Sequence, residues 1–472
     1  MKRPYSKNTT AIIIILLIIL FACKKNTTDN NTPPPPVIAF KKIYDIPINR
    51  ESMYYSCFSQ TRDNGFFVAG ALRTDLYVDK SISFLIKTDG AANVIWAKTY
   101  SINGGVDCKA AIQTSDGGYM LVGNSKTPGS SAMIFLIKTN ANGDIAWTKI
   151  IHAERDAIVH YPIYCTDVKQ TNDNGFIVKG TGDMWDDHPF LLKTDAVGNI
   201  QWMKSYRISI ALNPSGKSVI TSADNGGVFV TSFGDDWILV KTKSNGDIDW
   251  NRRYASDFGF EVGSIGIQAN DGGYVFTGSS AQDVVAGRLD ATLIKTNANG
   301  NIMWWKEYGG DNANEYGYSI IQAADGGYVI GGARFDFSAL SKSNVFIVKT
   351  NEQGDTTWTR MYDGGDPNRY TGIYFGNKLM LQLSQDNGYI FAAGAQVLDQ
   401  SAQKRDRIYL AKADNKGHIG CNEYSDNVRV TSITSDNRSA VNFSIVDLNP
   451  RIFESSFTAT SVLINTAKIC PQ

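Results

Sequence analysis

The sequence IKTNANGNIMW at residues 294–304 recurs, with variations, at a nearly constant spacing along the chain, and this repetition indicates the fold. A short apolar run ends in Lys-Thr, a turn rich in Asn, Asp and Gly follows, and Trp comes last. Similar stretches occupy residues 86–96, 137–147, 192–202, 240–250 and 348–358, and a seventh at 411–421 has Cys in place of Trp. The lysine recurs about once every fifty residues, as Lys87, Lys138, Lys193, Lys241, Lys295, Lys349 and Lys412.

A second element precedes each copy of the first and reads, in its sixth copy, ADGGYVIGG from Ala324. Its Asp-Gly or Asn-Gly pair is a strong hairpin signal, because Gly and Asn adopt positive φ at little cost. Seven paired copies of two elements exclude coincidence. The copies begin at Arg62, Ser115, Asn172, Ala223, Asn270, Ala324 and Gln385.

Each repeat therefore contains four short strands, which in the sixth copy are residues 319–322, 328–331, 345–349 and 357–362. Four strands in about fifty residues, repeated seven times, predict an all-β, seven-bladed β-propeller over residues 39–424. A β-helix would need a shorter repeat, and a sandwich would not repeat.

An additional copy of the fourth strand, FKKIY at residues 40–44, stands before the first full repeat, with Phe in place of Trp. The seventh repeat's own fourth strand, near residues 421–424, is degenerate. We therefore expect residues 40–44 to complete the last blade and close the ring, which would cover an open sheet edge.

The N-terminus has the features of an export signal. Basic residues precede an apolar run at residues 11–22, which is too short to span a membrane. The end of this run and the residue after it, Leu20-Phe21-Ala22-Cys23, resemble the bacterial lipobox. The resemblance implies that residues 1–22 are a signal peptide and that Cys23 carries a diacylglyceryl group. An ordinary secretory signal with a chance Cys is the alternative.

The segment at residues 23–38 is polar and then Pro-rich, so we expect an extended linker between the lipid and the folded body. The lipid would be the membrane partner. The expected location is the cell envelope, at the outer membrane, with the periplasmic or surface side left open.

The D/N-x-x-G-x-x-x-W pattern resembles the tryptophan-docking motif of quinoprotein-type β-propellers. From about residue 40 to residue 424, the repeat also resembles propeller lipoproteins of Bacteroidetes-like bacteria. The first resemblance implies that the repeated tryptophans stack between neighbouring blades; sugar platforms are the alternative. These residues are Trp96, Trp147, Trp202, Trp250, Trp304 and Trp358.

The resemblance does not extend to redox chemistry. Quinoprotein dehydrogenases hold pyrroloquinoline quinone and calcium, typically have eight blades, and in many cases carry adjacent cysteines. This chain has seven repeats and no adjacent cysteines, so we expect no cofactor.

Charge and motifs favour a binding role. The 46 basic and 46 acidic residues balance, which argues against a nucleic-acid partner. The chain has no nucleophile elbow, HExxH, P-loop or Rossmann fingerprint. We therefore expect a non-catalytic binding or scaffolding module for an extracellular glycan or protein. The alternatives are a hydrolase or lyase acting on glycans, and a purely structural or adhesion protein.

The variable loops suggest where a ligand binds. The first-to-second and third-to-fourth strand turns are short, whereas the other two classes of connection are long and emerge together on one face. That face would carry a polar group in the third blade and in the loop leading into it. Its candidate ligand-binding residues, for a metal or a polar ligand, are Asp183, Trp185, Asp186, Asp187, His188, His152 and His160.

The spacing of this group matches no defined metal motif, so the metal stays unknown, and unrelated loop residues are the alternative. The remaining cysteines suggest one disulfide: Cys421 and Cys470 flank the β-rich extension at residues 425–472, and a bridge would tie it to the seventh blade. Cys108 and Cys165 are expected to be buried thiols outside any disulfide. Whether the extension caps the propeller or forms an appendage stays open.

Overall fold

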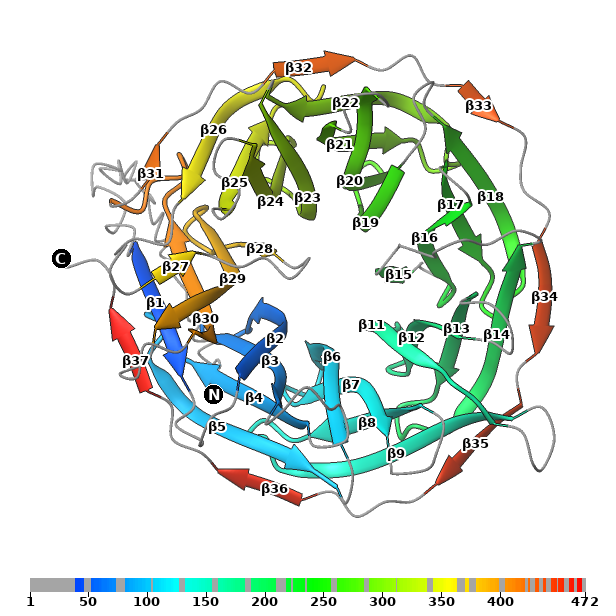
Figure 1. The fold of residues 1–472 in the computed structure, drawn as a ribbon. Coiled ribbons are helices and arrows are strands. Elements are labelled where there is room, and N and C mark those ends of the chain that lie inside the picture. The colour runs from blue at the N-terminus through cyan, green and yellow to red at the C-terminus, as the bar shows by residue number, and fades with distance from the viewer. Residues whose placement is uncertain are drawn as a thin grey trace, which may run out of the picture. The chain divides into compact units, whose positions relative to one another are not determined.

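The structure is a computed structural model. Its described residues belong to a compact unit spanning residues 37–472. In this unit the strands form seven antiparallel sheets around a ring, so the chain is an all-β, seven-bladed β-propeller, as the repeat predicts (Figure 1). The residues described are 39–45, 52–73, 81–102, 105–126, 132–154, 160–182, 188–208, 218–221, 224–233, 236–255, 261–283, 288–310, 312–337, 343–362, 370–372, 379–398, 404–420, 423–424, 429–432, 436–438, 443–447, 449–453, 458–461 and 465–468.

Several sequence predictions fall outside these residues. They include the signal peptide, the lipidated Cys23, the Pro-rich linker, and both members of the proposed Cys421–Cys470 bridge. In the part of the chain that is described, no helix has the length and apolar character needed to cross a membrane.

Blades 1 to 6 each contain four consecutive strands, a to d, from the centre of the ring outward (Figure 1). Blade 1 is β2 (Ser52–Gln60), β3 (Phe66–Arg73), β4 (Ile82–Thr88) and β5 (Val94–Ser101). Blade 2 is β6 (Gly105–Gln113), β7 (Tyr119–Lys126), β8 (Met133–Thr139) and β9 (Ile145–Glu154), with β10 (His160–Tyr161) paired to β9. Blade 3 is β11 (Tyr164–Gln170), β12 (Phe176–Thr181), β13 (Pro189–Thr194) and β14 (Ile200–Ile208).

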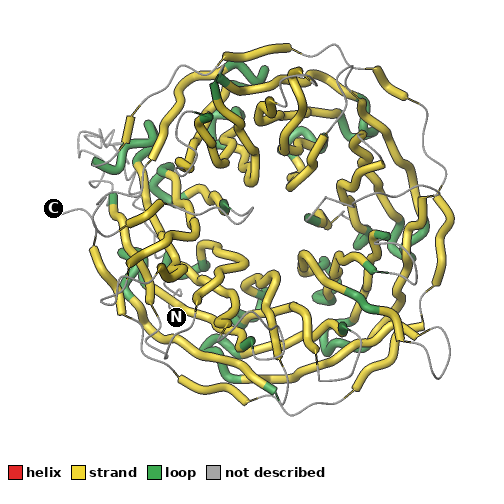
Figure 2. The backbone as a smooth tube through the Cα atoms, viewed as in Figure 1, coloured by secondary structure: helices red, strands yellow, loops and turns green. Residues whose placement is uncertain are grey.

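The second half of the ring repeats this order, and short loops join the strands at the tight turns (Figure 2). Blade 4 is β15 (Val219–Thr221), β16 (Gly227–Phe233), β17 (Asp236–Thr242) and β18 (Ile248–Ala255). Blade 5 is β19 (Glu261–Gln268), β20 (Tyr274–Asp283), β21 (Arg288–Thr296) and β22 (Ile302–Gly309). Blade 6 is β23 (Ala313–Gln322), β24 (Tyr328–Asp336), β25 (Ser343–Thr350) and β26 (Thr356–Tyr362).

Blade 7 is closed by the N-terminal strand, as predicted. Its strand a is in two pieces, β27 (Tyr370–Gly372) and β28 (Met380–Leu383), which both pair with strand b, β29 (Tyr389–Leu398). Strand c is β30 (Lys404–Ala413), and strand d is β1 (Phe40–Asp45). Phe40 lies opposite Lys412, just as Trp96 lies opposite Lys87 in blade 1. The Tyr44 hydroxyl donates to the carbonyl of Ala92 at 2.7 Å, so this strand also joins blade 7 to blade 1.

The C-terminal segment from Glu423 onward, which includes the β-rich extension, adds an outermost strand to every blade and encircles the ring (Figure 1, orange to red). It is therefore neither a cap nor an appendage, and it covers the edge strands that blades otherwise expose. The pairs are β31 (Glu423–Tyr424) with β26, β32 (Arg429–Ser432) with β22, β33 (Asp436–Arg438) with β18, β34 (Phe443–Asp447) with β14, β35 (Asn449–Phe453) with β9, β36 (Thr458–Ser461) with β5, and β37 (Asn465–Lys468) with β1.

This arrangement corrects the interpretation of residues 421–424 as a degenerate fourth strand of blade 7. The strand β31 pairs with β26 of blade 6 instead. The edge of β30 that it would have used is already occupied by β1.

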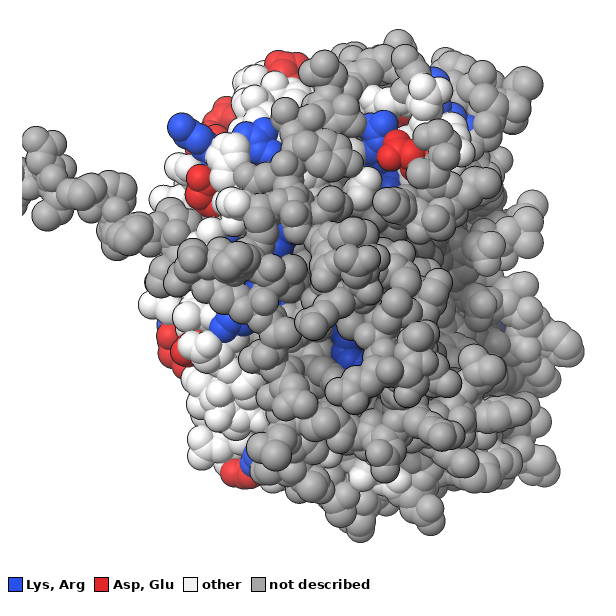
Figure 3. All heavy atoms as spheres, turned by 60° about the vertical axis from the view of Figure 1, so that its left-hand side comes forward, with Lys and Arg blue, Asp and Glu red and all other residues white. Residues whose placement is uncertain are grey.

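The hydrophobic core is divided into clusters, and each is shared between adjacent blades. One cluster joins Val275 and Leu293 of blade 5 to Ile330 and Phe346 of blade 6. On the outside, Lys and Arg are interspersed with Asp and Glu over the described atoms in view (Figure 3). The core therefore lies between the blades, and strand a of each blade is left to line the centre of the ring.

Candidate binding site

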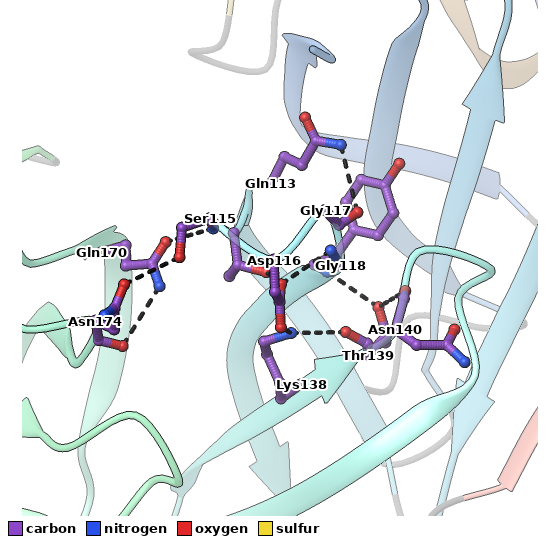
Figure 4. Close-up of polar contacts among 12 residues, drawn as sticks. Gln113, Ser115, Asp116, Gly117, Gly118, Lys138, Thr139, Asn140, Gln170 and Asn174 are labelled. Atoms are coloured by element: carbon purple, nitrogen blue, oxygen red, sulfur yellow. Dashed lines mark hydrogen bonds and ion pairs between the residues drawn. The ribbon is translucent and has the colours of Figure 1, made fainter. Parts of the chain in front are cut away.

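The repeated Lys and Asp form an ion pair beside the tight a–b turn (Figure 4). In blade 2, Lys138 Nζ lies 2.7 Å from Asp116 Oδ2 and donates to the carbonyl of Thr139 at 2.8 Å. Partial burial would raise the pKa of Asp116, but hydrogen bonds from Lys138, Thr114 and the Gly118 amide outweigh it and lower this pKa to about 2. A Cβ on Gly118 would lie 2.0 Å from the Thr139 carbonyl oxygen, which explains the second Gly of the repeat.

The same ion pair recurs around the ring, except in blade 4, where Lys241 Nζ lies 2.5 Å from Asp249 Oδ2 on strand d. The repeated motif is therefore structural. The equivalent pairs are Lys87–Asp63, Lys193–Asp173, Lys295–Asp271, Lys349–Asp325 and Lys412–Asp386.

Side-chain bridges also join neighbouring a–b turns (Figure 4). The Ser115 amide donates to Gln170 Oε1 of the next blade at 2.7 Å, and Ser115 Oγ lies 3.1 Å from Asn174 Oδ1. In the same way, the Arg62 amide donates to Gln113 Oε1 at 3.0 Å. Contacts of this kind join neighbouring blades at the tight-turn face.

Each repeated tryptophan contacts the blade that follows it. The ring of Trp96 is edge-on to Tyr119 of blade 2, with centroids 5.8 Å apart. Equivalent contacts place Trp147 beside Phe176, Trp250 beside Tyr274, Trp304 beside Tyr328, and Trp358 beside Tyr389. The Trp202 ring lies against Gly246, and its Nε1 donates to the carbonyl of Ser244 in blade 4 at 2.8 Å.

A cavity of about 400 Å³, here called the central cavity, lies at the centre of the ring and takes lining residues from the innermost segment of all seven blades. Ser56, Lys109, Thr166 and Tyr318 are extra residues at β-bulges, at the same place in strand a of blades 1, 2, 3 and 6. All four line the cavity. One structural position of the repeat therefore carries a small hydroxyl in blades 1 and 3, an ammonium group in blade 2 and a phenol in blade 6.

The wall of the central cavity contributed by blades 2 and 3 carries two lysines. Lys109 Nζ lies 2.8 Å from Asp107 Oδ2, and the Lys109 side chain is 27% exposed. Lys169 Nζ lies 3.5 Å from Asp167 Oδ2, and its side chain is 43% exposed. The opposite wall, from blades 5 to 7, is more apolar and includes Ile265 and Met380.

A buried acidic group lies where blade 5 meets blade 6. Glu315 of β23 is fully buried, and its carboxylate lies 3.3 Å from Arg334 Nη1. Burial raises the pKa of Glu315 to about 7, because Asp290 and Asp336 oppose the favourable charge of Arg334. Arg334 Nε also lies 2.9 Å from Asp336 Oδ1. This group is far better suited to shape the blade interface than to reach a ligand.

The predicted ligand group of the long-loop face is only partly described. Asp183, Trp185, Asp186 and Asp187 lie outside the described residues. His188 is buried just before β13 of blade 3, and its carbonyl accepts from the Gly182 amide at 3.0 Å.

The two other histidines of this group lie in the sheet of blade 2, not in a loop leading into blade 3. His152 belongs to β9, which extends to Glu154, and His160 belongs to β10, which folds back on β9. The outer strand of blade 2 is thus longer than the repeat predicts. Across the described residues, no cluster of three or more His, Cys, Asp or Glu could hold a metal ion.

Sequence reasoning did not single out Lys109 or Lys169. An alignment of the repeats would have revealed Lys169, because blades 2, 5 and 6 have Ile at the equivalent position of strand a. Cys57, Cys108 and Cys165 share one position beside the bulges and are buried outside any disulfide, as expected for the latter two.

Neither a protein-family model nor a curated protein matches the chain. Similar solved structures include a protein of unknown function from Dyadobacter fermentans, at 10% identity and a TM-score of 0.42, covering 80% of this chain and 99% of that one. A neuraminidase-like protein of bat influenza A (H18N11) has 9% identity and a TM-score of 0.36, covering 79% and 91%. Drosophila Plexin A, solved with Semaphorin 1b, has 8% identity and a TM-score of 0.32, covering 75% and 86%. Likenesses this distant carry no argument about function.

Proposed function

We propose that the protein is a non-catalytic binding or scaffolding module of the cell envelope, with an extracellular glycan or protein as its ligand. The ligand would bind at the centre of the ring, either at the face of the long b–c and d–a connections or in the central cavity, whose lining runs from the bulges of strand a to Arg62 of an a–b turn. No cofactor and no nucleic acid enter this proposal.

The observation that carries the proposal is the contrast between two sets of equivalent positions. Where the repeat builds the scaffold, most blades use the same residues, such as the Lys138–Asp116 pair and its counterparts. Where strand a lines the central cavity, the blades differ, with Ser56, Lys109 and Tyr318 at one position. Repeated identity favours a rigid support, and local divergence favours recognition on that support.

A binding array tests this function. The chain from Lys24 onward, without the residue that would carry lipid, is applied to glycan and peptide arrays. Selective retention of one ligand class, reduced by substitutions lining the cavity mouth, is the expected result. Uniform failure on both arrays would overturn the proposal and favour a purely structural role.

The proposed anchor is the lipid on Cys23, which would place the chain at the outer membrane. Metabolic labelling with palmitate in a bacterial host should mark the wild-type chain and not Cys23→Ala. The variant should also leave the membrane fraction. Equal labelling of both chains would contradict lipidation at this residue.

A further inference from the structure

We infer that the central cavity binds a small organic carboxylate, with its anionic group at Lys169 and Lys109 and its apolar portion against Ile265, Tyr318 and Met380. The inference rests on the proposed binding function and names a ligand class for the cavity itself. Its volume of about 400 Å³ lies within the usual range for small-molecule sites, ~300–1,000 Å³.

The first step is the charge of the lysine wall. The Asp167 carboxylate, which faces Lys169, is already engaged: its Oδ1 accepts from the Val168 amide and its Oδ2 from the Val219 amide, both at 2.9 Å. The 3.5 Å separation between Lys169 Nζ and Asp167 Oδ2 is an ion pair and not a close hydrogen bond. An ammonium group has three donors. Lys169 therefore keeps donor capacity directed at the cavity.

A second lysine shares Asp167 from behind the wall. Lys179 of β12 is fully buried, and its burial lowers its pKa to about 8, an effect that the charge of Asp167 opposes. The lining itself carries the cations Lys109, Lys169 and Arg62, and the carboxylates of Asp107 and Asp167 pair with the two lysines, so the lining has a small excess of positive charge.

The excess of positive charge in the lining is small, and this favours a ligand with a single negative charge. Lys109 is matched by Asp107 at 2.8 Å, so the lining does not offer the dense positive charge that a multiply charged phosphate needs. A single carboxylate matches it better. Desolvation inside the ring strengthens such a contact relative to bulk water.

The third step is the opposite wall. Across the centre of the ring from β6 and β11 lie β19, β23 and β28, which contribute Ile265, Tyr318 and Met380 (Figure 1). The Tyr318 ring stacks on Tyr316 with centroids 5.9 Å apart, which holds its orientation. A carboxylate with an aryl or alkyl body would span both walls, whereas acetate would use only one.

The test compares matched probes on the lipid-free chain from Lys24 onward. Isothermal titration and ligand-observed NMR are run with 4-phenylbutyrate, 4-phenylbutan-1-ol, 4-phenylbutan-1-amine and acetate, and with a panel of other aryl and alkyl carboxylates and their alcohols. We expect 4-phenylbutyrate to bind with one-to-one stoichiometry, at least about tenfold more tightly than its alcohol or acetate.

Variants then locate the site. Lys169→Met should weaken carboxylate binding about tenfold or more, and Lys169→Arg should retain it. Lys98→Met is the matched control, because Lys98 also pairs with an Asp but lies on strand d of blade 1, away from the cavity lining. Met380→Ala should weaken 4-phenylbutyrate more than acetate. Thermal unfolding of each variant shows that it is folded.

Three results would overturn the inference: no carboxylate binding above its alcohol, equal losses in Lys169→Met and Lys98→Met, or tighter binding of the amine. If the arrays retain a ligand and the carboxylates fail, only this inference falls. If the carboxylates bind through Lys169 and the arrays fail, the glycan or protein assignment falls and the cavity site stands.

Discussion

The ring of Trp96 lies against Gly143 of the next blade so closely that a Cβ there would be 2.8 Å from Cη2 and Cζ3 of the indole. Gly143 has a φ of +76°, and its carbonyl accepts from the Tyr100 hydroxyl at 2.8 Å. The Gly at this position of the c–d turn in blades 2 to 7 thus has two roles, whereas in blade 1 Ala92, with a φ of +59°, takes its place and accepts from the Tyr44 hydroxyl. The Gly permits the turn, and it receives the aromatic side chains of the preceding blade.

Gly143→Ala should therefore destabilise the propeller through both effects. The positive φ costs about 1 kcal/mol for an L side chain, and crowding against Trp96 adds ~1–3 kcal/mol. Gly117→Ala is the matched control, since Gly117 has a φ of +83° with nothing within 4 Å of its Cβ position. Urea denaturation measures both. Equal losses in the two variants would show that the Trp96 contact contributes nothing.

The blades could be predicted from the sequence because repeated side chains, such as the Lys–Asp pairs and the tryptophans, make the contacts within and between them. Phe40 and Tyr44 occupy the positions of Trp96 and Tyr100, so the closing strand was also visible in the sequence. The extension was predicted to be β-rich, but the blade that each of its strands joins was not, because pairing such as Glu423 with Tyr362 uses backbone groups and leaves no repeated pattern. The cavity lining was hidden by the bulges, since one extra residue, such as Lys109, changes which side chains face the centre.

Removing the last strand should loosen the closing strand specifically. The strand β37 pairs with β1, where Lys42 lies opposite Lys468 and Asp45 opposite Asn465. A chain ending at residue 463 leaves that edge of β1 open. Among the amides of residues 42–45, hydrogen exchange should accelerate about tenfold or more at those that donate to β37, whereas the amides of β1 that donate to β30 and those of β19 should change little. A chain ending at residue 468 is the control and should match wild type. Equal exchange in both truncated chains would contradict the pairing.

Asp116→Asn should alter the acid limb of the stability profile. The pKa of Asp116 is about 2 in the folded protein and about 3.8 ordinarily, so the ionised group stabilises the fold above pH 4, and this contribution is lost as the pH falls through 2. Because the carboxylate is 61% exposed, solvent screening keeps the loss at neutral pH below about 1 kcal/mol.

Lys138→Met should remove much of the same pH dependence, since the Lys138 ammonium is one of the principal groups that hold the pKa of Asp116 low. Urea midpoints between pH 2 and pH 7 measure each variant. Asp116→Asn running parallel to wild type from pH 4 to pH 2 would contradict this account of the ion pair.

Glu315→Gln should make the propeller more stable at pH 8 and leave it unchanged at pH 4. The pKa of Glu315 is about 7 in the folded protein and about 4.5 ordinarily, so the folded state holds this proton more tightly. Stability therefore falls as the pH rises from 4.5 to 7, by about 3 kcal/mol, and stays lower above that range. Gln carries no charge and removes this slope, while Arg334 keeps its contact with Asp336 at 2.9 Å. Glu352→Gln, at an exposed turn of blade 6, is the control and should follow wild type. Free energies of unfolding at pH 4, 6 and 8 measure this effect, and a wild-type slope in Glu315→Gln would show that folding does not raise the pKa of this carboxyl group.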